Sequence, residues 1–250
     1  MESFRLALSF LTIIPGGERE PAGKDVFVRS TKYFPLVGLI IGVIVATVYQ
    51  IASYRLPDLV SSALAVLSLV VVTRALHLDG LADTCDGLVG GRDSKHALSI
   101  MKDSRVGSFG AAAIALAVML KITLLASIAS NLKIRAIILF PVIGRWVATV
   151  ALSTQRYAKS EPGLGSLFMD SDGLNRVSIG ISTIASSIIT VISAIITVKW
   201  LAAITIPAAA IFMVVFMFMV NRKIGGLTGD IIGAMIELSE ITVLIALAAV

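Results

Sequence analysis

The sequence predicts an all-α integral membrane protein that crosses the bilayer about seven times. Of its 250 residues, 57% are hydrophobic and only 15% are charged, and the mean hydropathy is +0.95. Soluble domains are typically about 45–50% apolar and about 25% charged, and a chain of this size cannot bury such an excess in one globular core. A single cysteine excludes a secreted disulfide scaffold.

The first segment, Met1–Pro15, is expected to lie on or dip into the membrane. Charged residues interrupt it and no small-residue cleavage site follows, so a signal peptide is not expected. Its apolar residues recur at helical spacing, which predicts a short amphipathic helix with Phe4, Leu8 and Leu11 on one face.

Seven further stretches are apolar enough to cross the hydrocarbon core, which takes about 20 residues per helix. The stretches that contain no charge are Tyr33–Tyr54, Val177–Val198 and Trp200–Asn221. The others tolerate one or two charges: Leu59–Leu76 with Arg74, Gly107–Ser130 with Lys121, Ala136–Ser153 with Arg145, and Ile231–Val250 with Glu237 and Glu240. Pro141 and Pro207 fall inside spans and are expected to kink them. Residues 1–250 thus form a single transmembrane domain.

The connecting segments differ in charge between the two faces of the membrane. Most of the 21 Lys and Arg residues fall on the face that receives Met1–Lys32, Leu76–Val106, Thr154–Arg176 and Arg222–Asp230. This face is expected to be cytoplasmic, in a multi-pass protein of the cell membrane. The net charge of +5 is assigned to the same bias rather than to nucleic-acid binding, and membrane lipid is the expected environment.

An acidic segment on the cytoplasmic face, His77–Arg92, is the first candidate site. Asp79, Asp83 and Asp86 are spaced i, i+4, i+7, so they share one face of a helix. Carboxylate ligands of this kind suit Mg²⁺ or Mn²⁺, whereas zinc would require additional Cys or His ligands. Mg²⁺ is usually held together with substrate phosphates, so the segment predicts a phosphate-bearing substrate. The alternative is a solvated acidic loop. His77 is expected to contribute a hydrogen bond, and Cys85 to be a small packed side chain.

Two further polar clusters follow. In Ile100–Gly110, Lys102 and Arg105 are suited to a pyrophosphate, and Asp103 to a further ligand or a general base, although positive-inside residues with a helix cap are an alternative. In Gly225–Glu240, Asp230 and Glu237 share a helical face. Glutamates within a span usually face the bundle interior. Arg145, on a neighbouring helix, is a candidate counter-charge for these glutamates or a ligand for substrate phosphate. The alternative is that Glu237 and Arg145 form a buried pair that orders the bundle. Lys121 is expected to extend outward.

These motifs together resemble the cobalamin synthase family, also described as adenosylcobinamide-GDP ribazoletransferase or cobalamin 5′-phosphate synthase. The HLDGLADTxDG block of that family matches His77–Gly87, its IMKDSRxG block matches Ile100–Gly107, and its GGxTGDxxGAxxELxE block matches Gly225–Glu240. The shorter runs Phe10–Pro15, Phe34–Gly38 and Arg156–Gly165 are also similar. The resemblance covers nearly the whole chain in order.

The resemblance implies an Mg²⁺-dependent phosphotransferase that joins adenosylcobinamide-GDP to α-ribazole, or to its 5′-phosphate, and releases GMP. The catalytic residues are then expected to be Asp79, Asp83, Asp86 and Asp103, the first three binding Mg²⁺. The residues expected to contact the corrinoid and nucleoside substrates are His77, Arg92, Lys102, Arg105, Arg145, Thr228, Asp230 and Glu237. A homodimer is compatible with this arrangement.

Two alternatives are weighed against this interpretation. CDP-alcohol phosphotransferases perform similar chemistry with a DxxDGxxAR motif, but only Asp83–Gly87 echoes its start, so direct membership is rejected. A transporter for a divalent cation usually binds its solute near the bilayer midplane, often on inverted repeats. Here most carboxylates gather at the cytoplasmic boundary and no repeat is visible, which favours an enzyme.

Overall fold

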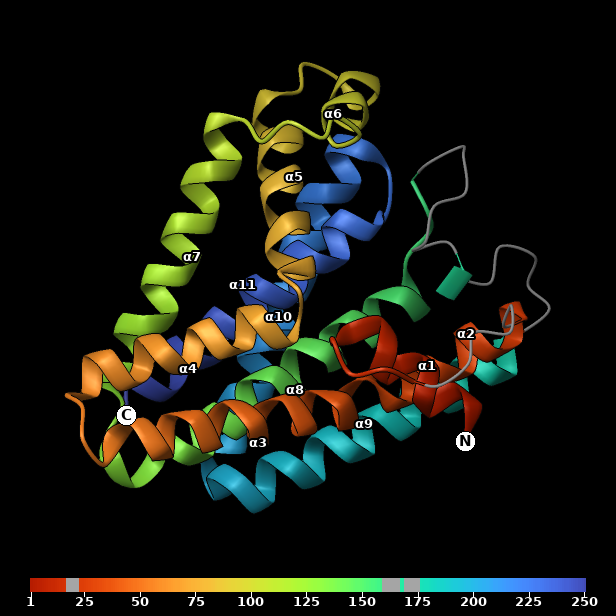
Figure 1. Ribbon diagram of the computed structural model, residues 1–250. Coiled ribbons are helices and arrows are strands. Elements are labelled where there is room, and N and C mark those ends of the chain that lie inside the picture. Colours follow the sequence, from red (N-terminus) through yellow and green to blue (C-terminus); the bar gives the residue numbers. More distant parts are fainter. Residues whose placement is uncertain (17–22, 159–166, 169–175) are drawn as a thin grey trace.

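The computed structural model describes residues 1–16, 23–158, 167–168 and 176–250 (Figure 1). Its described elements are helical, as the sequence predicts. The α-helices are α1 (Glu2–Leu11), α2 (Lys24–Ser30), α3 (Phe34–Ser53), α4 (Asp58–Val72), α5 (Leu76–Gly90), α6 (Ser94–Ile100), α7 (Ser108–Ser127), α8 (Ser130–Thr154), α9 (Arg176–Val198), α10 (Ala202–Ile224) and α11 (Gly229–Ala248), with 3-10 turns η1 (Thr31–Tyr33) and η3 (Lys199–Leu201). Residues 159–165 of the family-like run Arg156–Gly165 lie outside the described residues.

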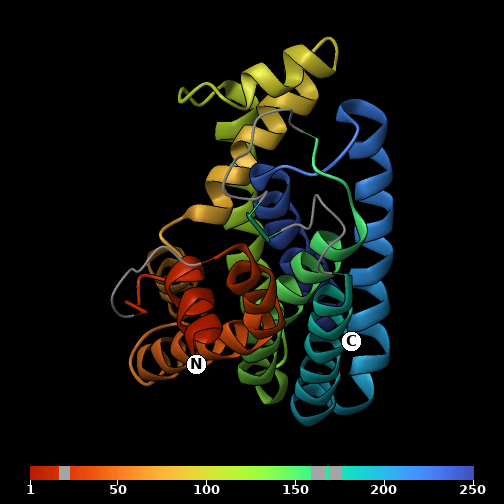
Figure 2. The ribbon, with the colours of Figure 1, turned by 90° about the vertical axis from the view of Figure 1, so that its right-hand side faces the viewer.

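The predicted count of seven spans is not confirmed. Within the described residues, five helical stretches are long and apolar enough to cross a membrane, or six if the bent pair α4 and α5 forms one span. The difference arises at two places. Helix α4 has only 15 residues. Helices α9 and α10 follow each other through η3 without a gap, so they fall in one stretch of 46 residues, although Figure 2 shows the chain reversing direction between them.

The break between α4 and α5 sets the direction of the acidic helix. The predicted span Leu59–Leu76 ends early, at Val72, because Arg74 and Ala75 both have positive φ, at 55° and 54°, a conformation that cannot continue a right-handed helix. The two helix axes then differ by 88°. Helix α1 and the segment after it contact this break: Ile13 N–H donates to Val72 O at 2.8 Å, and Arg74 Nη2 donates to Ser9 O at 2.9 Å.

The predicted amphipathic N-terminal helix is confirmed as α1. Ala7 and Leu11 are buried on its inner face, and Phe4 and Leu8 pack against the core from partly buried positions. It contacts α2 and α3 and brings its C-terminal end over the start of α5. The first helix therefore forms part of the wall around the acidic segment.

Helices α8 and α11 lie at the centre of the bundle. Helix α8 packs against α3, α9 and α11, and α11 packs in addition against α5, α7 and α10. Pro141 is accommodated inside α8 and Pro207 inside α10, as predicted. Most side chains of α8 and α11 are buried, including the charged residues Arg145, Glu237 and Glu240.

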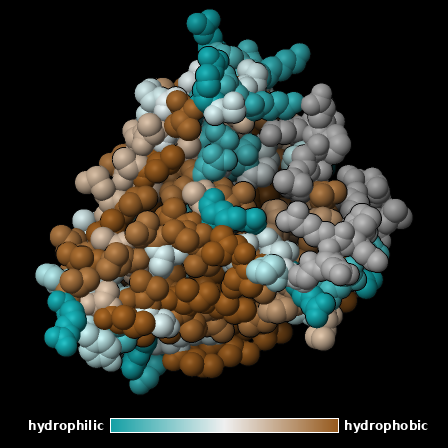
Figure 3. Space-filling view, viewed as in Figure 1, coloured by the Kyte–Doolittle hydropathy of each residue, from teal (hydrophilic) through white to brown (hydrophobic). Residues whose placement is uncertain are grey.

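The outer surface is apolar over most of its height. Large exposed hydrophobic side chains occur on α7, α9 and α10, among them Leu116, Met119, Ile184, Ile188, Ile192, Ile211, Val214 and Phe218. Figure 3 shows hydrophobic side chains over most of the lower part of this face, with hydrophilic ones at the end that carries α6 and in smaller groups at the lower left and lower right edges. A contiguous exposed apolar surface of this kind marks contact with lipid, so the protein is a membrane protein.

Candidate active site

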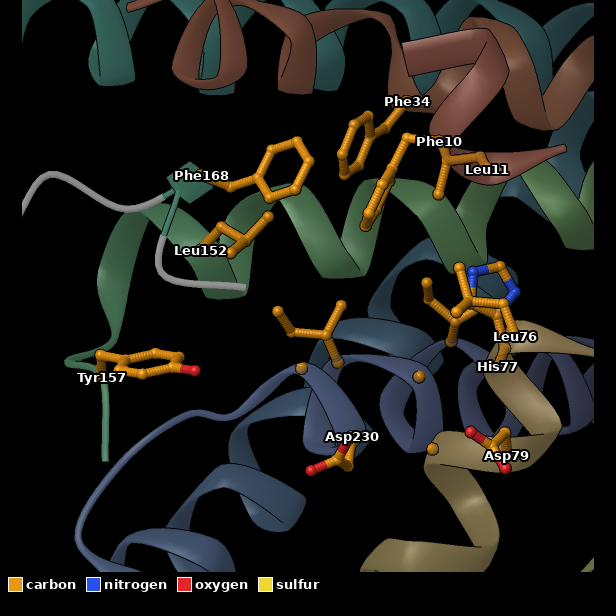
Figure 4. Close-up of a pocket in the computed structure, with 15 residues that line it drawn as sticks. Phe10, Leu11, Phe34, Leu76, His77, Asp79, Leu152, Tyr157, Phe168 and Asp230 are labelled. Carbon is orange, nitrogen blue, oxygen red and sulfur yellow. The ribbon is translucent and has the colours of Figure 1, made fainter. Parts of the chain in front are cut away.

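A pocket of about 260 Å³ opens between α1, α3, α5, α8 and α11 (Figure 4). Its polar lining includes His77 and Asp79 from the start of α5 and Asp230 from the start of α11. The remaining lining residues are Phe10, Leu11, Phe34, Leu76, Gly80, Leu152, Tyr157, Phe168, Gly229, Ile232, Gly233 and Ile236. Two of the three sequence-predicted clusters therefore meet at one cavity.

Glycines let α5 and α11 cross closely enough for this meeting. A Cβ atom at Gly80 would lie 2.8 Å from Asp230 O, and one at Gly233 would lie 3.2 Å from His77 O. Larger side chains at these two positions would push the helices apart. The N-terminus of α11 is fixed by its cap, because Thr228 Oγ1 accepts the N–H of Ile231 at 3.2 Å. Thr228, which forms this cap, is buried and is not among the residues that line the pocket.

The side of the pocket away from the carboxylates is aromatic. The ring centroids of Phe10 and Phe168 lie 4.6 Å apart, and the ring of Phe34 is 5.6 Å from Phe168 and 6.4 Å from Phe10. Figure 4 shows the three rings grouped together, with Asp79 and Asp230 on the opposite side of the pocket. Tyr157 stands at one end of the cavity. It is positioned by an isolated parallel bridge to Leu227, the residue just before the α11 cap.

The three predicted metal ligands on α5 have different surroundings. Asp79 is exposed, Asp83 is partly buried and Asp86 is buried. Both oxygens of Asp86 accept backbone N–H groups at the start of α7, from Gly107 at 2.7 Å and from Gly110 at 2.9 Å. A carboxylate at a helix N-terminus is stabilised by these orphan donors and by the helix dipole. Asp86 thus anchors α7 to α5.

These three carboxylates do not converge on one point. Asp79 and Asp86 are separated along α5 by seven residues, which is about 10 Å at 1.5 Å per residue. In the part of the chain that the structure describes, no three His, Cys, Asp or Glu side chains are grouped so as to hold a metal ion. A metal at this site would therefore need fewer protein ligands, completed by water or substrate.

The predicted cationic residues lie at the far end of α5 from the pocket. Arg92, Lys102 and Arg105 are exposed around α6 and the turn before α7. Arg105 donates through its backbone N–H and through Nε and Nη2 to the carboxylate of Asp103, at 2.7–3.2 Å. These hydrogen bonds lower the pKa of Asp103 to about 2. A carboxylate with so low a pKa is a weak proton acceptor and is poorly suited to general-base catalysis near neutral pH.

Four charged residues form a buried network beneath the pocket. Lys121 Nζ donates to Glu237 Oε2 at 2.7 Å and also contacts Glu240, whose other oxygen accepts from Arg145. All four side chains are at most 5% exposed. Two cations and two anions balance, as buried charges require. The expectation that Lys121 extends outward is wrong: α11 places two carboxylates beside it, and their attraction outweighs the gain from reaching water.

His77 connects this network to the pocket. Its Nδ1 lies 3.3 Å from Arg145 Nη2. Because a guanidinium has only donors, Nδ1 must accept and the imidazole carries its proton on Nε2. His77 lines the pocket, whereas Arg145 and Glu237 are not among the lining residues. The network therefore orients His77 rather than contacting the cavity itself.

The comparison with known proteins bears on these motifs directly. The model of a family described as cobalamin-5-phosphate synthase matches residues 3–248. The chain belongs to this family.

Relatives of this chain support its assignment to the cobalamin-5-phosphate synthase family over nearly the whole length of the chain. An adenosylcobinamide-GDP ribazoletransferase of Clostridium novyi (strain NT) is 37% identical over 247 residues, which cover 99% of this chain and 96% of the relative. Proteins of the same name from Syntrophobacter fumaroxidans and Desulfitobacterium hafniense are 36% and 33% identical, each over 98% of this chain. No solved structure matches the chain.

The residues that sequence reasoning missed in this family member are those of the aromatic wall. Phe10, Phe34 and Tyr157 fall in the three shorter runs that resemble the family, but apolar residues in a membrane protein carry no sign that they face a cavity. Those runs were the available signal, because they resemble the family outside the polar blocks. Phe168, beyond them, had no such signal.

Proposed function

We propose that this chain is an adenosylcobinamide-GDP ribazoletransferase that acts in assembly of the cobalamin nucleotide loop. A ribose hydroxyl of α-ribazole, or of its 5′-phosphate, attacks the phosphorus atom linked to cobinamide. A new P–O bond forms to the ribose oxygen as the bond to the GMP phosphate breaks. GMP leaves with the electron pair, and the hydroxyl proton passes to a carboxylate of the protein.

The observation that carries this proposal is the meeting of Asp79 and Asp230 at one pocket. They come from different motif blocks, and the close crossing of α5 and α11 places both on the same cavity. A carboxylate within hydrogen-bond reach of a hydroxyl can orient it and accept its proton as the phosphorus–oxygen bond forms. These two residues are therefore proposed to hold the attacking hydroxyl.

Mg²⁺ is proposed as the cofactor, with Asp79 and Asp83 as its protein ligands. These residues stand one helical turn apart on α5, and Mg²⁺ is commonly held by one or two carboxylates together with waters and substrate phosphates. When bound, the ion would offset the negative charge of the pyrophosphate. Asp86 is left out of the ligand set, because both of its oxygens already accept N–H groups of α7.

The exposed basic residues at the α6 end are proposed to attract the nucleoside-diphosphate part of the donor. Arg92, Lys102 and Arg105 lie there together with the C-terminal end of α10, since Lys223 Nζ donates to Gly91 O at 2.7 Å. Basic residues concentrated at one end of a membrane protein indicate its cytoplasmic side. The pocket is accordingly proposed to be supplied from the cytoplasm.

The direct test is GMP release by purified protein in detergent or proteoliposomes. The assay supplies adenosylcobinamide-GDP, with and without α-ribazole and Mg²⁺, and identifies the corrinoid product by mass. Release that requires both additions supports the proposal. Absence of release from protein shown to be folded would refute it, and CDP-alcohols and then cation flux would be tested next.

Variants of the acidic residues separate their roles. Asp79→Asn and Asp83→Asn are expected to lower turnover at least tenfold and to raise the Mg²⁺ concentration needed for half-maximal rate. Glu2→Gln, an exposed acidic residue in the first turn of α1, is the matched control and should behave like the unsubstituted protein. Unchanged Mg²⁺ dependence in both α5 variants would remove these residues from the metal site.

A further inference from the structure

The shape and chemistry of the pocket point to one of the two substrates named above, so the following inference rests on the proposed function. At about 260 Å³ the cavity is slightly smaller than most small-molecule sites, which span about 300–1,000 Å³. A nucleoside is compatible with that size. A corrinoid, several times larger than a nucleoside, cannot enter it.

The two sides of the cavity differ in the groups they offer. Near α5 and α11 the side chains of His77, Asp79 and Asp230 supply hydrogen-bonding atoms. The opposite side is built from the rings of Phe10, Phe34 and Phe168. Leu11 and Leu152, which also line the cavity, add no polar atoms. One end is thus suited to hydroxyl groups and the other to an apolar, flat ring system.

We propose that the pocket binds the acceptor nucleoside with its benzimidazole base against the wall formed by Phe10, Phe34 and Phe168 and its ribose toward Asp79 and Asp230. Aromatic rings favour stacked or edge-to-face contacts at centroid distances of about 4.5–7 Å, the range that the three phenylalanines already adopt with one another. Phe34 and Phe168 are buried, whereas Phe10 is only partly buried and presents its ring to the cavity.

The same wall discriminates against the other base in the reaction, the guanine of the donor. Guanine carries several hydrogen-bond donors and acceptors around its edge, and burying them against phenylalanine and leucine would leave them without partners. The dimethylated benzimidazole of α-ribazole has two methyl groups and only one free ring acceptor. The aromatic wall therefore selects the acceptor and leaves the GDP part of the donor outside the pocket.

The test compares Phe10→Leu with Phe212→Leu in the purified, full-length protein. Phe212 stacks on Phe216 in α10 at 5.6 Å and does not line the pocket, so it controls for loss of a ring contact elsewhere. Equilibrium dialysis measures the Kd of α-ribazole, and GMP release measures the KM of each substrate. Folding is checked by gel filtration and circular dichroism.

Phe10→Leu is expected to raise the Kd and the KM for α-ribazole about fivefold or more, the loss typical of one base–aromatic stacking contact, while the KM for adenosylcobinamide-GDP stays within twofold. Phe212→Leu should change neither. An increase in the donor KM alone, or no change in either substrate, would overturn the assignment. If Phe10→Leu does not fold, Phe10→Tyr replaces it in these measurements, and competition by guanosine is measured on the unsubstituted protein. Guanosine should fail to displace α-ribazole, and displacement would overturn the assignment.

The inference and the proposed function fail separately. Unsubstituted protein that binds α-ribazole and is weakened by Phe10→Leu, yet releases no GMP, would retain the subsite and refute the transferase. Protein that releases GMP but whose Phe10→Leu variant binds α-ribazole normally would retain the transferase and refute the subsite.

Discussion

Replacement of Lys121 by methionine tests the buried network most directly. Methionine keeps the length of the side chain but removes its charge, leaving Glu237 and Glu240 with Arg145 as the only cation in the network. The described network changes from neutral to a net charge of −1, in surroundings where the carboxylates are at most 5% exposed.

The size of the effect follows from the geometry. At the 2.7 Å separation of Lys121 Nζ and Glu237 Oε2, Coulomb's law with an effective dielectric constant of about 20 gives an attraction of roughly 6 kcal/mol. Removing lysine also relieves its own desolvation, so the net loss is smaller. Breaking a buried pair by deleting one partner typically costs about 3–5 kcal/mol, and Lys121→Met is expected to lower the free energy of unfolding by that amount.

The assay is reversible unfolding in mixed micelles of dodecyl maltoside and sodium dodecyl sulfate, followed by circular dichroism. Lys95→Met, on the exposed surface of α6, is the matched control and should stay within about 0.5 kcal/mol. The double variant Lys121→Met/Glu237→Gln restores charge balance around Glu240 and Arg145 and should recover most of the loss. A Lys121→Met protein as stable as the Lys95→Met control would refute the reasoning.

Three further predictions concern Asp86, Gly80 and Asp103. Asp86→Asn should lower the free energy of unfolding by about 1–2 kcal/mol, because it removes a charged acceptor at the start of α7. The Mg²⁺ dependence of GMP release should not change. A shift in that dependence would return Asp86 to the metal site. Gly80→Ala should cost about 1–3 kcal/mol and reduce turnover, because its Cβ would lie 2.8 Å from a backbone oxygen of α11. Gly180→Ala in α9, with no atom within 4 Å of its Cβ, is the control and should be tolerated. Equal unfolding curves for the two variants would exclude the close crossing. The pKa of Asp103, about 2 and below its ordinary value, means that its stabilising pair with Arg105 is complete above about pH 4 and is lost only as pH falls toward 2. The pH–rate profile between pH 5 and 9 should therefore be the same in Asp103→Asn, and loss of an acidic limb in that variant would identify Asp103 as a base after all.

The sequence predicted the helix that carries the three aspartates, because helical spacing relates residues within one element. Asp79, Asp83 and Asp86 were expected on a helix, and α5 contains all three. Spacing alone does not say what packs against that helix. The start of α7 occupies Asp86, while the crossing of α11 brings Asp230 to Asp79. Of the three expected metal ligands, Asp86 therefore anchors α7, whereas Asp79 lines the pocket.

Composition and motif order determined the membrane class, the helical fold and the family, because hydrophobicity and local spacing are properties of the chain itself. The break between α4 and α5, the inward position of Lys121 and the aromatic wall around Phe10 were decided only by tertiary structure. In a chain that is apolar almost everywhere, hydrophobicity no longer distinguishes a side chain that faces lipid from one that faces a cavity or a neighbouring helix. Only the neighbours that fold against each helix supply that information.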